Sequence, residues 1–251
     1  MLLCLKMNKI LDFLRKVYLV LIAAPLFIVI TFLTALVTIV TTAVGGNRFW
    51  GYWPAHFWSR AVCCLALVKV KVKGRENIDP KTSYIFVANH QGAFDIWAIF
   101  GYLNHNFRWL MKKSLEKIFM VGYACRRSGH VFVDSNSLHS IKQTIDSARS
   151  QLKDGMSLVI FPEGTRTKTG KMGEFKRGAF LLAGEFRLPV VPVSIDGAYD
   201  IMPRNSYFPR PGVINLIIHE PILPDEKGFN TRQLLADCHN TIKQDLDSDN
   251  V

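Results

Sequence analysis

The chain has 251 residues, which fit one domain with a sizeable core after any membrane segment is set aside and argue against a second catalytic domain. Its formal net charge of +11 favours acidic partners, namely anionic lipid headgroups, phosphorylated substrates or nucleic acid. The five cysteines are an odd number without metal-ligand spacing, so we interpret them as reduced and structural.

The first predicted element is a long apolar helix. Residues 17–44 contain no charged side chain and are interrupted only by Pro25. This stretch is longer than the about 20 apolar residues that a helix needs to cross a hydrocarbon core. It is also longer than the apolar region of a cleaved signal peptide, which has about 7 to 15 residues. Basic residues lie on both flanks, so the positive-inside tendency draws both ends to the cytoplasmic face of a membrane.

A second apolar and aromatic run at residues 49–68, together with Pro25, allows a bent helix or a hairpin, and we favour embedding without a full crossing over a single span. Four aromatic residues of this run suit the headgroup layer, with the core of a soluble helix as the alternative: Trp50, Tyr52, Trp53 and Trp58. We assign residues 1–66 to a membrane-embedded helix or hairpin and residues 67–251 to the main domain, on the cytoplasmic face.

The main domain alternates strand-like and helix-like blocks. Strands are expected at residues 68–72, 83–88, 107–111, 130–134, 157–161, 189–195 and 213–219, and helices at 94–102, 138–152, 176–186 and 231–246. The first strand alternates valine with lysine, which is typical of a half-exposed strand with a basic face. This order predicts an α/β fold with a central, mostly parallel or mixed sheet flanked by helices.

A candidate catalytic pair follows the second predicted strand. His90 leaves the end of this strand, and Asp95 comes five positions later. If Asp95 accepts a hydrogen bond from one imidazole nitrogen, it fixes the tautomer of His90 and leaves the other nitrogen as a general base. The spacing alone is a weak signal, because the same two residues could simply cap the start of a helix, where an acidic residue is favoured.

A second constellation stands directly after an apolar strand, at residues 161–166, which read Phe-Pro-Glu-Gly-Thr-Arg. Strand ends are where ligands bind in α/β folds. Arg166 can bind a phosphate through two parallel charge-assisted hydrogen bonds, Gly164 lets the backbone approach closely, and Thr165 offers a hydroxyl. We expect Glu163 to hold Arg166 in position. A solvated basic loop is the alternative.

Together the two blocks resemble the glycerolipid acyltransferase family, most closely its 1-acyl-glycerol-3-phosphate acyltransferases. The catalytic motif of that family, Asn-His-x4-Asp, stands here at residues 89–95, and its Phe-Pro-Glu-Gly-Thr-Arg motif at 161–166. Residues 111–115 and 188–193 are similar to two further motifs. The resemblance covers about residues 73–220.

The resemblance implies that neutral His90 takes the proton of a glycerol hydroxyl while that oxygen attacks a thioester carbonyl, and that Asp95 stabilises the imidazolium. The substrate-binding residues that it implies are Lys112, Phe161, Glu163, Gly164, Thr165 and Arg166. Of these, Lys112 and Arg166 would bind the acceptor phosphate. No Gly-x-Ser-x-Gly elbow is present and no cysteine lies in either motif, so we expect direct transfer without an acyl-enzyme.

The implied acceptor is 1-acyl-sn-glycerol-3-phosphate, a lysophosphatidic acid in the membrane lipid bilayer, and acylation of its 2-hydroxyl gives phosphatidic acid. The implied donor is a fatty acyl thioester of coenzyme A or of acyl carrier protein, which serves as co-substrate. We expect no other cofactor and no metal ion.

Two positions depart from the pattern of the family, because Phe119 replaces a usual proline and Ser135 a usual arginine. If that arginine holds the acceptor in relatives, either the acceptor differs here or another cation supplies the charge, and the candidates are Lys112, Lys113, Arg126, Arg127 and Arg177. The open alternatives are glycerol-3-phosphate or another lysolipid as acceptor, a hydrolase with His90 and Asp95 as metal ligands, and an inactive lipid-binding protein. Nucleic-acid binding explains only the net charge, so we expect no nucleic-acid partner.

Overall fold

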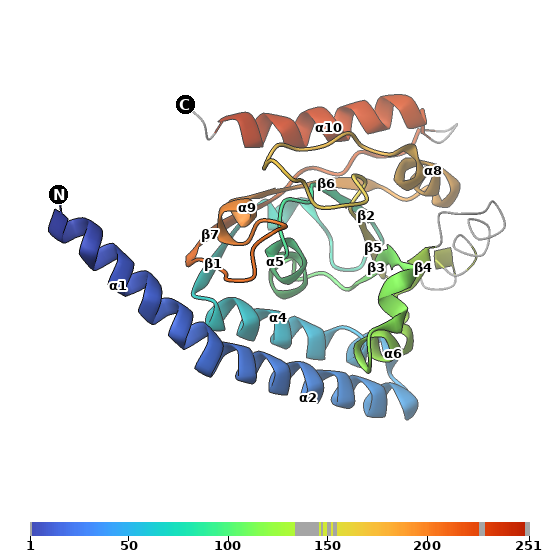
Figure 1. The fold of residues 1–251 in the computed structure, drawn as a ribbon. Coiled ribbons are helices and arrows are strands. Elements are labelled where there is room, and N and C mark those ends of the chain that lie inside the picture. The colour runs from blue at the N-terminus through green and yellow to red at the C-terminus, as the bar shows by residue number, and fades with distance from the viewer. Residues whose placement is uncertain are drawn as a thin grey trace.

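A single β-sheet forms the centre of the molecule (Figure 1). The structure, a computed structural model, describes residues 2–133, 146, 148, 149, 152, 155–225 and 229–248. The strands are β1 (Val68–Lys73), β2 (Ile85–Ala88), β3 (Phe107–Lys112), β4 (Val131–Val133), β5 (Ser157–Ile160), β6 (Val190–Asp196) and β7 (Gly212–Ile218). Among the described residues they lie in the order β1-β7-β6-β2-β5-β3-β4.

The sheet is mixed, and its parallel part brings three strand ends together. Strands β6, β2, β5, β3 and β4 run parallel to their neighbours, whereas β7 is antiparallel to β6 and parallel to β1. The carboxyl ends of β2, β5 and β3 therefore lie next to one another at one edge of the sheet. The predicted fold class, a central mixed sheet flanked by helices, is confirmed.

Helices cover both faces of this sheet, so that every residue of the central strands β2 and β5 is buried (Figure 1). The covering helices are α4 (Trp53–Leu65) and α5 (Phe94–Tyr102) on one face and α8 (Arg177–Phe186) and α10 (Thr231–Ser248) on the other. In β2, Phe86 and Ala88 join the core under α4 and α5, while Ile85 and Val87 join the core under α8 and α10. Each large side chain buried in this way stabilises the fold by about 1.5–3 kcal/mol.

The N-terminal helix continues past Pro25. Its two parts, α1 (Leu2–Tyr18) and α2 (Ala24–Ala43), are joined by a turn of π-helix, in which the N–H of Ala24 donates to the carbonyl of Leu19. Pro25 has no N–H and its ring would clash with the carbonyl four residues back, so the wider turn accommodates it and the helix bends there (Figure 1).

The chain reverses after α2, at residues 44–52. Gly45 and Gly46 have φ angles of 113° and 79°, in the left-handed region that glycine tolerates, and the short helix α3 (Asn47–Trp50) follows. Helix α4 then returns along α2 (Figure 1). The apolar segment is therefore bent at Pro25, and the chain reverses at these glycines so that α2 and α4 pack side by side.

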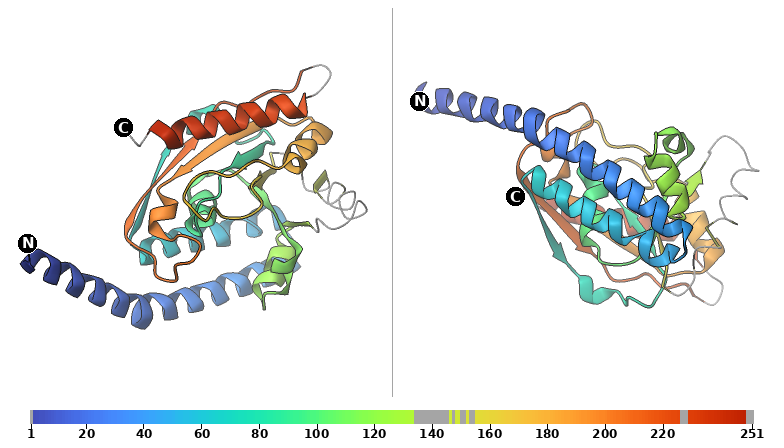
Figure 2. Two further views of the ribbon diagram at one scale, coloured as in Figure 1. Left: turned by 45° about the horizontal axis from the view of Figure 1, so that its top comes forward. Right: turned by 90° about the horizontal axis from the view of Figure 1, so that it is seen from below.

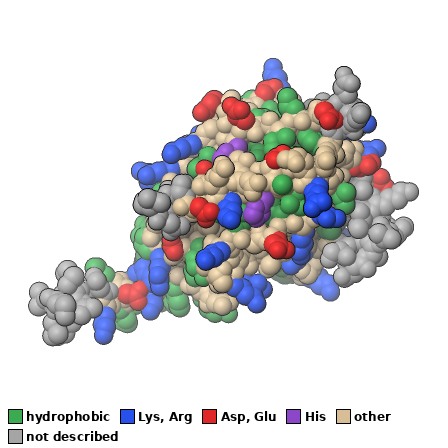
Figure 3. Space-filling model, turned by 90° about the horizontal axis from the view of Figure 1, so that it is seen from above, with side chains coloured by type: hydrophobic (Ala, Val, Ile, Leu, Met, Phe, Trp, Pro, Cys, Tyr) green, Lys and Arg blue, Asp and Glu red, His purple; other side chains and the backbone are tan. Residues whose placement is uncertain are grey.

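The outer side of α2 is apolar and exposed. Among the described residues one helix, Lys9–Ala43, is long and apolar enough to cross a membrane, and only 11% of its most apolar window is buried inside the protein. Ile28 and Leu33 are exposed by 66% and 51%, whereas on the inner side Trp58 of α4 donates a hydrogen bond to Thr31 of α2 at 2.9 Å. The opposite face of the molecule carries interspersed acidic and basic side chains (Figure 3).

The predicted strands and helices agree with the structure wherever it describes them. The helix expected at 138–152 lies largely outside the described residues, as does Ser135. The short helices α6 (Val121–Arg127) and α9 (Ala198–Ile201) were not expected. The division after residue 66 stays a prediction, and Tyr52 and Cys63 share one core with the sheet.

Candidate active site

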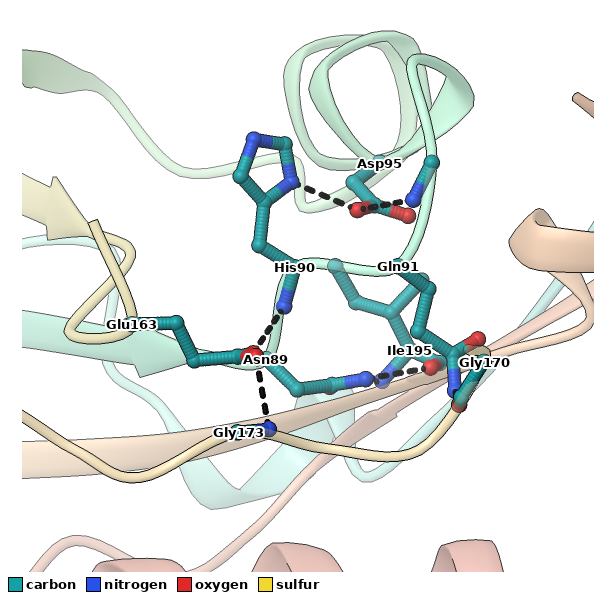
Figure 4. A network of polar contacts seen from close by, with 9 residues as sticks. Asn89, His90, Gln91, Asp95, Glu163, Gly170, Gly173 and Ile195 are labelled. Atoms are coloured by element: carbon teal, nitrogen blue, oxygen red, sulfur yellow. Dashed lines mark hydrogen bonds and ion pairs between the residues drawn. The ribbon is translucent and has the colours of Figure 1, made fainter. Parts of the chain in front are cut away.

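The candidate site lies where β2 and β5 end. Asn89 and His90 follow β2 directly, and Phe161 follows β5, the parallel neighbour of β2. Asn89 is fully buried and exchanges two hydrogen bonds of 2.8 Å with the backbone of Ile195 in β6. This side chain ties the turn after β2 to the next strand and thereby fixes the position of His90 (Figure 4).

His90 and Asp95 form the expected pair. The imidazole Nδ1 lies 2.7 Å from Asp95 Oδ2, and the N–H of Gly92 donates to the same oxygen at 2.9 Å (Figure 4). Asp95 is fully buried at the start of α5, whose N-terminal dipole favours its negative charge, while the His90 side chain keeps 13% exposure. Because a carboxylate only accepts, Nδ1 carries the proton, and Nε2 is left with its lone pair as a general base.

Aromatic stacking fixes the orientation of the His90 imidazole. The rings of His90 and Phe161 stack with centroids 4.0 Å apart and an angle of 8° between their planes, and Trp109 of β3 stacks on Phe161 at 5.3 Å. The segments after β2 and β5 thus supply the imidazole and its stacking partner, and β3 supplies the ring behind them. Phe161 therefore contacts the imidazole of His90, in addition to the substrate contact that the family resemblance implies.

Glu163 holds the backbone of the site. Its carboxylate accepts hydrogen bonds from the N–H of His90 at 2.6 Å and from the N–H of Gly173 at 2.8 Å (Figure 4). Burial raises the pKa of this carboxyl, and the two backbone hydrogen bonds oppose that rise. Among the described residues Glu163 makes no ion pair with Arg166, so the expectation that Glu163 positions Arg166 is not confirmed.

The other residues of the 161–166 motif form a bend beside the base. Gly164 has a φ of 71°, which favours glycine, and the hydroxyl of Thr165 accepts a hydrogen bond from Arg204 at 3.2 Å. Arg166 is half-buried and makes no hydrogen bond or ion pair with any of the described residues. Its guanidinium is therefore available to an anion.

Lys112 is more distant from the pair than the motif residues. It is the last residue of β3, which is separated from β2 by β5, and its side chain is exposed. Two of the alternative cations are engaged elsewhere, because Arg126 pairs with Glu116 at 2.9 Å and Arg127 donates to the carbonyl of Thr42 in α2 at 2.9 Å.

Sequence reasoning missed Arg204, Gly173 and Trp109. Arg204 lies far from both motifs in the chain and reaches Thr165 only through the fold. Of these three, Trp109 could have been found from the sequence, because it stands in the predicted strand 107–111, which pairs with β5, the strand directly before Phe161. Gly173 gave none, because its contribution is a backbone N–H.

Comparison with known proteins gives a consistent result. A family model described as Acyltransferase matches residues 69–196. A 1-acyl-sn-glycerol-3-phosphate acyltransferase of Chlamydomonas reinhardtii is 32% identical over 69% of this chain and 53% of its own length. A chloroplastic enzyme of the same name from Arabidopsis thaliana is 30% identical over 80% of this chain and 55% of its own length. The chain thus spans about half the length of these two relatives.

A solved structure extends the similarity to the N-terminal helices. The crystal structure of the 1-acyl-sn-glycerophosphate (LPA) acyltransferase PlsC from Thermotoga maritima superimposes with a TM-score of 0.75 at 27% sequence identity, and the match covers 96% of each chain. The matched family model includes both the His90–Asp95 pair and the 161–166 motif. The chain belongs to the Acyltransferase family.

Proposed function

We propose that the chain transfers a fatty acyl group from a thioester to the 2-hydroxyl of 1-acyl-sn-glycerol-3-phosphate, which gives phosphatidic acid. The observation that carries this proposal is the His90–Asp95 pair at 2.7 Å, in which Nε2 of the imidazole makes no hydrogen bond to any described residue. The names of the relatives support the same acceptor.

The proposed chemistry is one direct transfer. Nε2 of His90 takes the hydroxyl proton as that oxygen attacks the thioester carbonyl, and Asp95 stabilises the imidazolium that forms. The carbon–sulfur bond then breaks, and the leaving thiolate takes the proton back from the imidazolium. No acyl-enzyme forms in this proposal, because the hydroxyl oxygen attacks the thioester carbonyl directly.

Arg166 is the proposed ligand of the acceptor phosphate. It is half-buried, free of other partners among the described residues, and two positions after Gly164. A guanidinium can bind a phosphate through two parallel hydrogen bonds, each stronger than a neutral one. Lys112 at the end of β3 adds a second, more distant cation.

We also propose that α1 and α2 lie in one leaflet of the bilayer. The main domain contacts this helix close to both ends of its uncharged segment, residues 17–44, since Arg15 donates to the carbonyl of Pro209 at 2.7 Å and Arg127 donates to the carbonyl of Thr42 at 2.9 Å. Residues 15 and 42 are about 40 Å apart along a helix, which exceeds the about 30 Å of a hydrocarbon core. A helix that crossed the bilayer could not keep both contacts with a domain that stays in water.

The donor in this proposal is acyl-coenzyme A or acyl-acyl carrier protein, and the main domain faces the cytoplasm. The basic flanks of the apolar segment support that side. Neither donor needs a metal ion to react, because a thioester is already activated toward an alcohol.

The test is acyl transfer by the purified full-length chain with each donor in turn, offered 1-acyl-sn-glycerol-3-phosphate or glycerol-3-phosphate. We expect phosphatidic acid from the lysophospholipid with at least one donor. Faster acylation of glycerol-3-phosphate would reassign the acceptor, and no product from any pairing would refute the proposed function.

A further inference from the structure

An apolar tip lies outside the site described above, between β3 and β4. It consists of the 3-10 turn Lys113–Lys117, residues 118–120 and the start of α6. Its exposed large side chains are Leu115 (44%), Ile118 (49%), Phe119 (86%) and Tyr123 (50%). Isolated exposed apolar residues are ordinary, but four within nine residues concentrate apolar surface on one short segment, as is typical of an interaction site.

The backbone is built to present this tip. The N–H of Gly122 donates to the carbonyl of Ile118 at 2.8 Å, and Met120 has a φ of 57°. A Cβ at Gly122 would lie 2.1 Å from the carbonyl oxygen of Glu116, so only glycine lets α6 fold back onto the turn. Phe119 is thereby placed at the outermost point of a tight reversal.

The tip stands beside the apolar surface of α2. Helix α6 packs against α2, and Arg127 donates to the carbonyl of Thr42 at 2.9 Å. Both views place α6 next to the C-terminal end of α2, at the level of that helix and away from the α10 side of the sheet (Figure 1, Figure 2). On that end of α2, Val40 and Val44 are exposed by 55% and 86%, so the apolar surface continues from the helix to the tip.

Charge favours a lipid surface as the occupant. The exposed basic residues around the tip are Lys112, Lys113, Lys117 and Arg126, and among the residues that the structure describes Arg126 alone of these forms an ion pair, with Glu116. An apolar point ringed by lysines matches an anionic headgroup layer over an acyl-chain layer, and tyrosine is favoured where the two layers meet.

We infer that residues 115–123 are a second membrane-contact element, in which Phe119 and Ile118 enter the acyl-chain layer while the lysines contact anionic headgroups. This inference rests on the proposed placement of α2 in the bilayer. Lys112 ends β3 at the edge of the site and directly precedes the tip. Insertion of the tip therefore holds that edge at headgroup depth, where the phosphate of a lysolipid lies.

The test is photo-crosslinking of the full-length chain in vesicles of phosphatidylethanolamine and phosphatidylglycerol. The photoreactive p-benzoylphenylalanine replaces one residue at a time, at Phe119, at Phe32 of α2 as the lipid-facing reference, and at Leu181 of α8 as the water-facing reference. Phe32 is exposed by 50% and Leu181 by 60%, so the two reference positions are similarly accessible and differ in their proposed depth in the bilayer. After illumination, the mass of the intact protein reports lipid adducts.

We expect lipid adducts at positions 119 and 32, and at least about tenfold fewer at position 181. Lipid adducts at 32 without any at 119, or protein–protein adducts at 119, would overturn the inference. Acyl transfer is measured on the same samples. If an active protein gives no lipid adducts at position 119, only this inference is refuted. If lipid adducts form at position 119 but no condition gives acyl transfer, only the proposed function is refuted.

Discussion

At the scale of single residues, the site is organised by carboxylates that face the backbone. Asp95 accepts from His90 and from the N–H of Gly92, and Glu163 accepts from the N–H groups of His90 and Gly173. One carboxylate therefore orients the imidazole ring, while the other holds the main chain that carries it. Both are buried, which makes each of these hydrogen bonds costly to lose.

Asp95→Asn should reduce kcat by about 10²- to 10⁴-fold, because an amide can present its N–H₂ group to Nδ1 and favour the wrong tautomer. The KM values for donor and acceptor should change little. Initial rates at saturating substrate test this, together with circular dichroism to show that the variant is folded. A folded variant with a kcat near that of the wild type would contradict the role assigned to Asp95.

Arg166→Ala should raise the KM for 1-acyl-sn-glycerol-3-phosphate by about 10- to 100-fold, which corresponds to the loss of charge-assisted hydrogen bonds worth about 1.5–3 kcal/mol. The matched control is Lys168→Ala, an exposed cation two positions further on. If both variants raise KM equally, the effect comes from the net charge of the surface and not from a phosphate contact.

At the scale of elements, the sequence predicted the strands and helices well because their periodicities are clear. Residues 85–88 and 157–160 are apolar runs too short for a helix, and residues 94–102 fall on the observed α5. The antiparallel pairing of β7 with β6 was not predictable, since a parallel and an antiparallel pairing use the same apolar pattern.

The site was predictable where side chains carry it and not where the backbone does. His90 and Asp95 are close in the chain, so one turn brings them together. The true partners of Glu163 are two N–H groups from separate loops, and every non-proline residue has an N–H. No residue type in the sequence therefore identifies these two N–H groups as partners of Glu163.

Two buried histidines contact residues of β3 and β5, and their burial predicts that the free energy of unfolding falls at acidic pH. Nδ1 of His130 accepts a hydrogen bond from the N–H of Trp109, and Nε2 of His105 lies 2.8 Å from the hydroxyl of Ser157. Burial lowers the pKa of His105 to about 4 and that of His130 to about 3. Both values lie below the about 6.5 of an unfolded histidine, so the unfolded state binds protons first as the pH falls.

The stability that these neutral histidines contribute is therefore complete above about pH 6.5 and is lost as the pH falls toward 4. Between pH 7 and pH 5 the free energy of unfolding should drop by about 2 kcal/mol for each histidine. Thermal unfolding in detergent at the two pH values measures this, and His130→Gln should show about half the drop. Equal midpoints at pH 7 and pH 5 would contradict the prediction.

At the scale of the whole molecule, the N-terminal helix and the domain form one body. Helix α4 packs on α2 on one side, shares the core of the sheet on the other, and carries Tyr52 and Cys63 into the same cluster as Phe86. The polar face of the molecule lies on the opposite side of the sheet from α2 (Figure 3).

A helix lying in one leaflet predicts that the N-terminus and the main domain are on the same side of the membrane. A protease site placed before Met1 and a second one after Val251 should be cut together in vesicles of one orientation and be protected together in the other. Cleavage of the first site only where the second is protected would show a full crossing.

The most direct measurement is the rate of phosphatidic acid formation from a labelled long-chain acyl-coenzyme A and 1-acyl-sn-glycerol-3-phosphate, by the wild-type chain and by His90→Ala. If the assays with the two donors show that acyl-acyl carrier protein is the donor, this thioester is used in place of acyl-coenzyme A. We predict product with the wild type and a rate lower by about 10³-fold with His90→Ala. A folded His90→Ala variant that keeps the wild-type rate would show that the imidazole is not the base.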